Sequence, residues 1–255
     1  MTGVTPPALP VPRLVLWRHG QTEWNATGRF QGQLDPPLDE VGRNQAALAA
    51  PHLVATGLPP ERTVVVSSDL SRAAETAATL TALLGVPLLL DPRLREHGMG
   101  CWEGLTRDEV AQRYPDQYAD WVAGRPVRGR GGEDAAEVGE RALAALADLP
   151  EAPVAVVVTH GGTAGRLVER LLGLGPEHRR VFGALANCAW SELVHQGSRW
   201  RVVRHNSSVL QLPEAATGDA RPAPPVLRAV PGPSAAAGTP EDAPPPPVSD
   251  ADAVL

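Results

Sequence analysis

The stretch Leu14-Val15-Leu16-Trp17-Arg18-His19-Gly20-Gln21-Thr22 is a short apolar run that ends abruptly in polar residues. The apolar residues predict a buried strand. Arg18, His19 and Gly20 then lie where that strand ends, and in open α/β sheets ligands bind beyond the carboxyl ends of the strands. We therefore take His19 as a candidate nucleophile and Arg18 as a candidate ligand of the phosphoryl group it attacks. An isolated Arg-His-Gly turn is more often a solvated loop, so the rest of the chain has to support this hypothesis.

Outside this stretch, strand-like and helix-like patterns alternate along the chain. The predicted strands are 13–18, 63–67, 86–90 and 154–159, followed by a hairpin of 189–195 and 200–206. The predicted helices are 39–56, 70–84, 106–113, 133–149 and 163–172, the first capped by Asp39 and the third by Thr106 with Glu109. This alternation predicts an α/β fold, a three-layer α/β/α arrangement with a mainly parallel sheet and helices on both faces.

The composition divides the chain into one domain and two flanking segments. Residues 1–12 are rich in proline and predict a loose lead-in, and 13–210 form the predicted domain. Within it, 105–132 read as a lid-like insertion, and we expect 114–132 to be irregular because prolines and glycines interrupt that stretch. Residues 211–255 are rich in proline and alanine and predict a disordered tail.

Charge and residue usage exclude several kinds of chemistry. The 255 residues carry a formal net charge of −6, which gives no general attraction to nucleic acid or to an anionic membrane. All basic residues are arginine, so a lysine Schiff base and a P-loop lysine are excluded. Cys101 and Cys188 are far apart, so we expect neither a disulfide framework nor a metal site. The sequence shows no signal peptide and no membrane span, so we expect a cytoplasmic protein.

Polar groups recur just after the predicted strands. Besides Arg18, His19 and Gly20 they are Ser68 with Arg72, Arg95 with Glu96, and His160 with Gly161 and Gly162. If the sheet is parallel, these groups meet at one edge, because the carboxyl ends of all its parallel strands lie there. Arginine forks and helix N-termini neutralise a tetrahedral phosphate, so the set favours a phosphate-binding site.

A mechanism follows from these residue types. Neutral His19 would attack phosphorus and form a phosphohistidine, which water then hydrolyses. Glu96 is the candidate acid for the leaving group and then the base for water. A glutamic acid donates a proton well near neutral pH only where burial or nearby negative charge favours its protonated form. Arg18, Arg72 and His160 would stabilise the transferring oxygens, so the mechanism requires no metal and no cofactor.

The remaining histidines have simpler interpretations. We expect His52, His178, His195 and His205 to be ordinary surface or packing residues. Taken separately, Arg72, Glu96 and His160 also have structural interpretations as a helix, a loop and a turn residue. Only their conjunction with Arg18-His19-Gly20 favours catalysis.

Several sequence blocks resemble the histidine phosphatase superfamily, the phosphoglycerate-mutase-like proteins. The matching blocks are 18–25, 28–38, 42–46, 67–73, 94–96, 102–104, 131–133 and 160–162, and they occur in family order. The resemblance implies that His19 is phosphorylated, that Arg18, Arg72 and His160 form the phosphate pocket, and that Glu96 donates the proton. It implies the following substrate-binding residues: Arg18, Gly20, Gln21, Thr22, Asn25, Gln31, Gly32, Arg72, His97, Met99 and Gly161.

Within the superfamily, the chain resembles phosphatases more than mutases. Mutases carry a longer basic insertion after the acid block, whereas only 105–132 separate Gly104 from Glu133 here. The 33–35 and 187–190 stretches resemble actinobacterial glucosyl-3-phosphoglycerate phosphatases. The expected partner is a small phosphorylated metabolite of the sugar phosphate or phosphoglycerate type.

Some alternatives stay open at the level of sequence. One is phosphoglycerate mutase activity, and another is a non-catalytic module that binds a phosphorylated ligand. Arg125, Arg128 and Arg130 in the insertion fit either a second anionic group on the substrate or a solvated basic loop. The oligomeric state, including a homodimer, is also open.

Overall fold

The computed structural model describes residues 8–175, 178 and 181–209. Most of the predicted lead-in, 1–7, and the predicted tail, 211–255, lie outside the described residues.

The described chain alternates strands and helices, as the sequence predicts. The strands are β1 Arg13–Arg18, β2 Thr63–Ser67, β3 Leu88–Leu90, β4 Val154–Thr159, β5 Trp190–Gln196 and β6 Arg199–Ser207. The helices are α1 Glu23–Ala26, α2 Glu40–Ala55, α3 Ser71–Leu84, α4 Arg107–Arg113, α5 Pro115–Val122, α6 Ala135–Ala147 and α7 Gly161–Leu172. Short 3₁₀ turns cover Pro60–Arg62, Pro92–Leu94 and Gly100–Trp102.

The strands form one six-stranded sheet in the order β3-β2-β4-β1-β5-β6. The first four strands in this order are parallel, and β5 and β6 add an antiparallel hairpin beside β1. The predicted α/β fold with a mainly parallel sheet is therefore confirmed. The central strand β4 is buried along all six residues, because sheet neighbours flank it on both edges and helices cover both faces.

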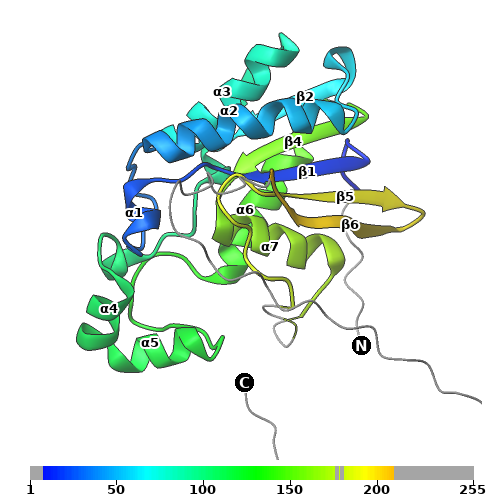
Figure 1. The fold of residues 1–255 in the computed structure, drawn as a ribbon. Helices are drawn as coiled ribbons and strands as arrows, with labels where there is room; N and C mark the ends of the chain where they lie inside the picture. The colour runs from blue at the N-terminus through cyan, green and yellow to red at the C-terminus, as the bar shows by residue number, and fades with distance from the viewer. Residues whose placement is uncertain (1–7, 176–177, 179–180, 210–255) are drawn as a thin grey trace, which may run out of the picture. The chain divides into compact units, whose positions relative to one another are not determined.

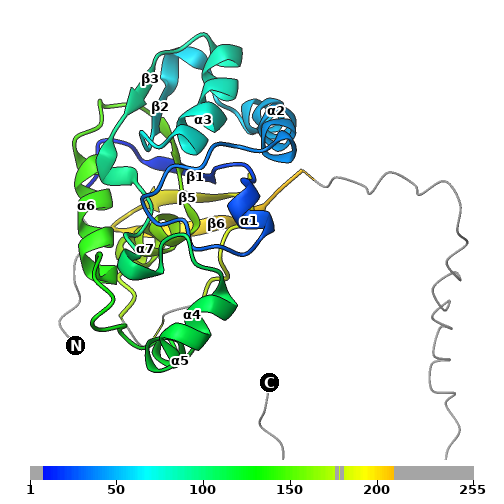
Figure 2. The same cartoon turned by 90° about the vertical axis from the view of Figure 1, so that its left-hand side faces the viewer.

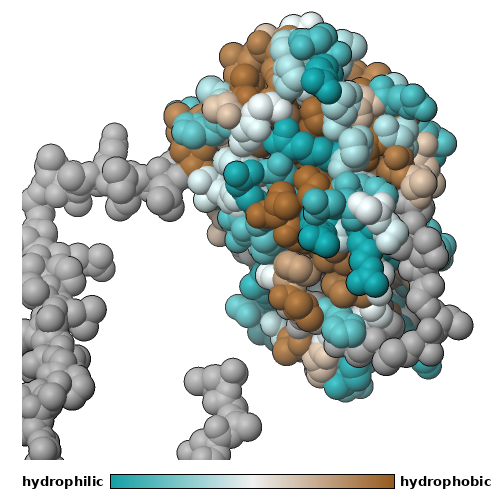
Figure 3. All heavy atoms as spheres, turned by 90° about the vertical axis from the view of Figure 1, so that its right-hand side faces the viewer, coloured by the Kyte–Doolittle hydropathy of each residue, from teal (hydrophilic) through white to brown (hydrophobic). Residues whose placement is uncertain are grey.

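Alternation along β1 divides its side chains between two hydrophobic cores. Val15 and Trp17 pack with the alanine-rich faces of α2 and α3, whereas Leu14 and Leu16 pack with α6 and α7. Figures 1 and 2 show these helix pairs on opposite faces of the sheet, with α4 and α5 beyond its edge. On the described surface seen in Figure 3, hydrophilic and hydrophobic side chains are interspersed.

The structure corrects three local expectations. Residues 115–122, expected to be irregular, form α5, since Pro115 occupies its first turn, where a proline costs no hydrogen bond. The residues between the predicted strand 13–18 and the predicted helix 39–56, where no helix was expected, contain α1, a single turn that Thr22 caps with a capping box to Asn25. The third strand begins at Leu88, two residues later than expected.

A contact between two glycines holds the loop after β1 against α2. A Cβ atom added to Gly20 would lie 2.4 Å from the carbonyl oxygen of Gly42, and one added to Gly42 would lie 2.0 Å from that of Gln21. Neither position has room for a larger residue. Asp39 caps α2 by accepting from the Gly42 N–H at 2.7 Å. The first turn of α2 is thus defined by its cap, and the same turn holds the loop that carries His19 through the contact of Gly42 with Gly20.

Candidate active site

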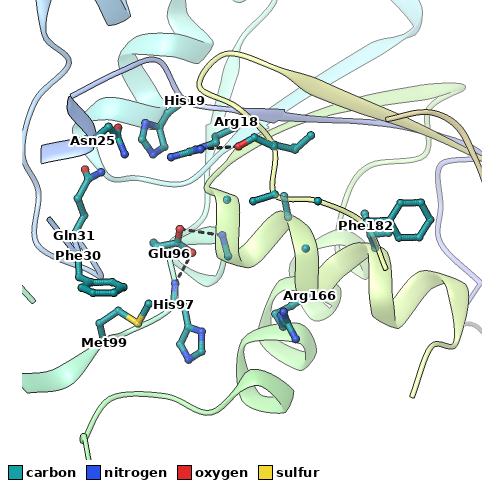
Figure 4. Close-up of a pocket in the computed structure, with 18 of the residues that line it drawn as sticks. Arg18, His19, Asn25, Phe30, Gln31, Glu96, His97, Met99, Arg166 and Phe182 are labelled. Atoms are coloured by element: carbon teal, nitrogen blue, oxygen red, sulfur yellow. Dashed lines mark hydrogen bonds between the residues drawn. The ribbon is translucent and has the colours of Figure 1, made fainter. Parts of the chain in front are cut away.

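A cavity of about 400 Å³ opens at the carboxyl edge of the parallel strands. The predicted residues that line it are Arg18, His19, Asn25, Gln31, Gly32, Arg72, Glu96, His97, Met99 and Gly161. In Figure 4, Arg18, His19 and Asn25 lie on one side of this cavity and Glu96, His97 and Met99 on another. The structure thus brings together residues from β1, α3, α7 and the loops after β1 and β3.

His19 is buried directly after β1, and its ring has a fixed orientation. Its backbone N–H donates to the Thr159 carbonyl at 3.0 Å, which ties the residue to the end of β4. Its Nδ1 lies 2.7 Å from the Gly20 carbonyl oxygen, which can only accept. The hydrogen is therefore on Nδ1, and a neutral ring leaves the lone pair on Nε2.

Burial and nearby arginines keep the His19 ring neutral. Burial lowers the pKa of His19 well below its ordinary value, and the positive charges of Arg18 and Arg72 lower it further. The hydrogen bond to Gly20 acts in the opposite direction but is the weaker influence on this pKa.

His160 lies beside His19 at the N-terminus of α7. The two ring centroids are 5.0 Å apart, with the planes inclined by 59°. Its Nε2 lies 2.9 Å from the Ser68 hydroxyl oxygen, and its buried Nδ1 has no hydrogen-bond partner. Burial lowers the pKa of His160 well below its usual range, and Arg72 adds to this effect.

Arg18 and Arg72 supply the fixed positive charge of the site. Arg18 donates to the Leu185 carbonyl at 2.6 Å, and Arg72, which is fully buried, donates to the carbonyls of Leu34 and Gly32 at 2.8 and 3.0 Å. The Nε atoms of both arginines are buried without a partner. Burial lowers the pKa of Arg72 to about 10, so the guanidinium stays charged at neutral pH.

Glu96 is held at the N-terminus of α7. Its carboxylate accepts from the backbone N–H groups of Gly162 and Thr163, each at 3.0 Å, and from that of His97 at 2.8 Å. Figure 4 shows two of these bonds as dashed lines from Glu96, one of them to His97. A Cβ atom on Gly162 would lie 2.5 Å from the Glu96 carboxylate, so a glycine is required for this approach. The N–H groups and the positive end of the helix therefore fix the carboxylate in place.

Arg141 and Glu133 support the loop of Glu96, and of the two the sequence placed only Glu133 in a family block, 131–133. Arg141 of α6 donates to the carbonyls of Arg95 and Glu96 at 2.8 and 3.0 Å. It also pairs with Glu133, which accepts from the Gly98 N–H at 2.8 Å. Arg141 belongs to an ordinary amphipathic helix in the sequence, so no local signal marks this role.

Asn187 similarly organises the loop that follows β1. Its Nδ2 lies 3.3 and 3.2 Å from the carbonyl oxygens of His19 and Gly20 and 3.1 Å from Oδ1 of Asn25. Because Oδ1 of Asn25 also accepts from the Thr22 N–H, the Asn25 amide presents its NH₂ group on the other side. The 187–190 stretch appeared in the sequence only as part of a resemblance.

Three predicted substrate-binding residues do not line the cavity. Gln21 donates its side-chain N–H to Asp39, and Thr22 is buried as the N-cap of α1. Gly20 lies against Gly42. The structure places all three behind the cavity wall, where they shape the loop that carries His19.

Most residues that line the outer part of the cavity were not predicted from the sequence. It includes Phe30, Trp121, Arg166 and Phe182, together with two histidines expected to be ordinary surface or packing residues, His178 and His205. His205 joins Ser191 to the Gly183 carbonyl, at 2.8 and 2.9 Å. These residues come from the loop between α1 and α2, the insertion, α7 and the segments around β5 and β6, whose meeting point cannot be read from local patterns.

The described residues hold neither a candidate metal centre nor a membrane-spanning helix. No group of three or more His, Cys, Asp or Glu residues in this part of the chain could hold a metal ion. Among the described helices, none has the length and apolar character needed to cross a membrane.

Residues 14–208 match the family model of the histidine phosphatase superfamily, branch 1. A glucosyl-3-phosphoglycerate phosphatase of Mycolicibacterium vanbaalenii is 39% identical in an alignment of 194 residues that covers 72% of this chain and 84% of the relative. A probable phosphoglycerate mutase of Yersinia pestis is 38% identical in an alignment of 192 residues that covers 74% of this chain and 87% of the relative.

The fold has solved counterparts as well. A mycobacterial glucosyl-3-phosphoglycerate phosphatase, solved with VO3, superimposes with a TM-score of 0.68 at 37% identity, covering 77% of this chain and 100% of that one. The chain therefore belongs to the histidine phosphatase superfamily, branch 1, and is a phosphatase of that type.

Proposed function

We propose that the protein is a metal-independent phosphomonoesterase that hydrolyses a small phosphorylated metabolite through a phosphohistidine on His19. The observation that carries this proposal is the bond from His19 Nδ1 to the Gly20 carbonyl. It places the hydrogen on Nδ1 and leaves the Nε2 lone pair for attack on phosphorus. The lowered pKa of His19 keeps that lone pair unprotonated at neutral pH.

The transferring phosphoryl oxygens would be bound by groups that now lack partners. Arg18 and Arg72 each have a buried Nε–H without an acceptor, and His160 has an unpartnered Nδ1. The Ser68 hydroxyl can donate to Nε2 of His160, which leaves a hydrogen on Nδ1 for a phosphoryl oxygen. A phosphate would thus replace missing hydrogen bonds and provide negative charge beside Arg18, which has no ion pair among the described residues, and beside Arg72, whose only ion pair there is to Asp35 at 3.7 Å.

Glu96 would protonate the leaving oxygen and then activate water. The α7 N-terminus fixes its carboxyl group beside the cavity, where it would transfer a proton to the leaving oxygen. After the alcohol leaves, the ionised carboxylate would take a proton from the water that attacks the phosphohistidine. In both steps Arg18 and Arg72 would stabilise the negative charge on the transferring phosphoryl oxygens, which is the main task in phosphoryl transfer.

The substrate we propose is a sugar phosphate or phosphoglycerate, with glucosyl-3-phosphoglycerate first among those to test. The support is the identity of 39% and 35% to glucosyl-3-phosphoglycerate phosphatases of two mycobacterial species. A cavity of about 400 Å³ also lies within the range of small-ligand sites. Relatives named probable phosphoglycerate mutases make phosphoryl transfer to a second hydroxyl the alternative.

The proposed reaction is tested by phosphate release from p-nitrophenyl phosphate and from glucosyl-3-phosphoglycerate in EDTA. Full activity should persist in EDTA, and His19→Ala should lose at least ~10³-fold in kcat/KM because it lacks the nucleophile. His52→Ala, an exposed histidine of α2, is the matched control. Activity in His19→Ala equal to that of the control would refute the proposal, and faster interconversion of phosphoglycerates than phosphate release would favour the mutase.

The acid role of Glu96 predicts a dependence on the leaving group. Glu96→Gln should lower kcat/KM by about 10²–10⁴-fold for an alkyl phosphate, whose alkoxide must be protonated as it leaves. The loss should be much smaller for p-nitrophenyl phosphate, because nitrophenolate leaves without a proton. Equal losses for both esters, measured side by side, would contradict a general-acid role.

The buried histidines predict how stability depends on pH. The pKa values of His19 and His160 are lowered in the folded protein, so below pH ~6.5 the unfolded chain binds more protons than the folded one. The free energy of unfolding should therefore fall as the pH drops from 7.5 to 5.5, by up to about 1.4 kcal/mol per pH unit for each histidine. Urea unfolding of wild type and His19→Gln checks this, since the variant should show the shallower slope. Identical slopes would contradict the lowered pKa of His19.

A further inference from the structure

Asn187 contacts residues of the active site without lining its cavity. It lines a separate hollow of about 190 Å³ beside α2. Its Nδ2 lies 3.3 and 3.2 Å from the carbonyl oxygens of His19 and Gly20. A backbone carbonyl only accepts, so the group that Asn187 turns toward this loop is its NH₂. The same Nδ2 lies 3.1 Å from Oδ1 of Asn25.

The backbone around Asn187 is held on both sides. Cys188 has a left-handed backbone with φ of 55°, which a residue other than glycine adopts only where its surroundings enforce it. Its carbonyl accepts from Nε1 of Trp17 at 3.0 Å. On the other side, the Ala186 N–H donates to Oδ1 of Asn206 at 2.8 Å. The Asn187 amide is therefore presented from a fixed turn.

Asn187 occupies an acceptor that would otherwise serve Thr22. Oδ1 of Asn25 accepts from the Thr22 N–H and from Nδ2 of Asn187, each at 3.1 Å. A carbonyl oxygen has two lone pairs, so both are now in use. The Thr22 hydroxyl also lies 3.1 Å from this oxygen and must therefore donate elsewhere. Because Asn25 lines the cavity, its NH₂ group remains for a ligand there.

The other acceptor within reach of the Thr22 hydroxyl is Oε1 of Gln31, at 3.1 Å. Thr22 is fully buried, so its hydroxyl hydrogen needs an acceptor inside the protein. A bond to Oε1 turns the NH₂ group of Gln31 away from Thr22. Gln31 also lines the cavity, and in Figure 4 its side chain lies next to that of Asn25, on the side of His19.

A second pattern of hydrogen bonds becomes available when Asn187 is removed. The Thr22 hydroxyl can then donate to the vacated lone pair of Asn25, and Gln31 can turn its NH₂ group toward the Thr22 oxygen. Gln31 would then present its carbonyl oxygen to the cavity, where it repels a phosphoryl oxygen. Asn187 thus selects between two orientations of an amide that it does not touch.

We propose that Asn187 is a positioning residue that acts through Asn25 and Thr22 to fix Gln31 with its NH₂ group toward the phosphoryl oxygens. The inference rests on the proposed phosphomonoesterase function. The family resemblance implies that Asn25 and Gln31 bind substrate, and the inference adds what orients them. The connection runs only through hydrogen bonds between 3.1 Å neighbours, from Asn187 to Asn25 and from Thr22 to Gln31.

The test is a double-mutant cycle on the binding of inorganic phosphate, measured by calorimetry on the full chain. Gln31→Ala should weaken binding about tenfold or more, as expected for loss of a hydrogen bond to a charged acceptor, and Asn187→Ala should cause a loss of similar size. The two losses have one origin, so the double variant should bind at least about threefold more tightly than their product predicts. Losses that simply multiply would overturn the proposal.

The matched control is Asn206→Gly, which removes the hydrogen bond to the Ala186 N–H and so loosens the same turn. Glycine tolerates the left-handed backbone of this position, where φ is 52°. The control should have a small effect that multiplies with that of Gln31→Ala. Coupling of equal size in the control would overturn the role of the Asn187 amide, because loosening of the turn would then explain it.

Wild type alone provides a second test that does not depend on the folding of any variant. In ¹H–¹⁵N spectra, the side-chain N–H groups of Gln31 should exchange with water more slowly once inorganic phosphate is bound, because a phosphate oxygen then accepts from them. Those of Asn187 should be equally protected with and without phosphate, since they serve the loop. Unchanged exchange and unchanged resonances of the Gln31 NH₂ group at saturating phosphate would overturn the proposal.

Failure of this inference and failure of the proposed function are distinguishable. Losses that multiply, in a protein that binds inorganic phosphate and releases it from phosphoesters, would overturn only the role of Asn187. A wild type that neither binds inorganic phosphate nor releases it from any phosphoester would instead refute the phosphomonoesterase function.

Discussion

The hydrogen bond from Nδ1 of His19 to the Gly20 carbonyl is the interaction on which the site depends. It fixes the tautomer and aims Nε2 at the cavity, while burial beside two arginines keeps the ring neutral. The same carbonyl accepts from Asn187, and the backbone on either side is held by β4 and by the close contact with Gly42. The carboxyl edge of the sheet thus holds the ring of the proposed nucleophile in a fixed orientation.

The rest of the site complements this one ring. Arg18 and Arg72 bring positive charge into a buried part of the site, where the Nε–H of each guanidinium has no hydrogen-bond acceptor. Glu96 takes its position from the first turn of α7, so the helix that packs beneath the sheet also holds the proposed acid. The elements that hold the proposed catalytic groups therefore also form the core, which explains how a core poor in aromatic residues can still fix the geometry.

The sequence predicts much of this because its strongest signals are local. The apolar run before Arg18, the valine run of β4 and the glycines after His160 mark strand ends, and parallel strands bring their carboxyl ends to one edge. Contacts between distant segments leave no such signal. Arg141, Asn187 and His205 act from a helix, a loop and a strand that look ordinary in isolation. Pro115 was misleading for a different reason, since a proline begins a helix as readily as it breaks one.

The central claim is that the phosphoryl group passes through Nε2 of His19. Rapid acid-free quenching of the enzyme with excess phosphoester, followed by peptide mass spectrometry and phosphorus NMR, tests it most directly. The account predicts a transient phosphate on Nε2 of His19, which accumulates when Glu96→Gln slows its hydrolysis. Phosphate found on another residue, or turnover with no phosphoenzyme in either protein, would contradict it.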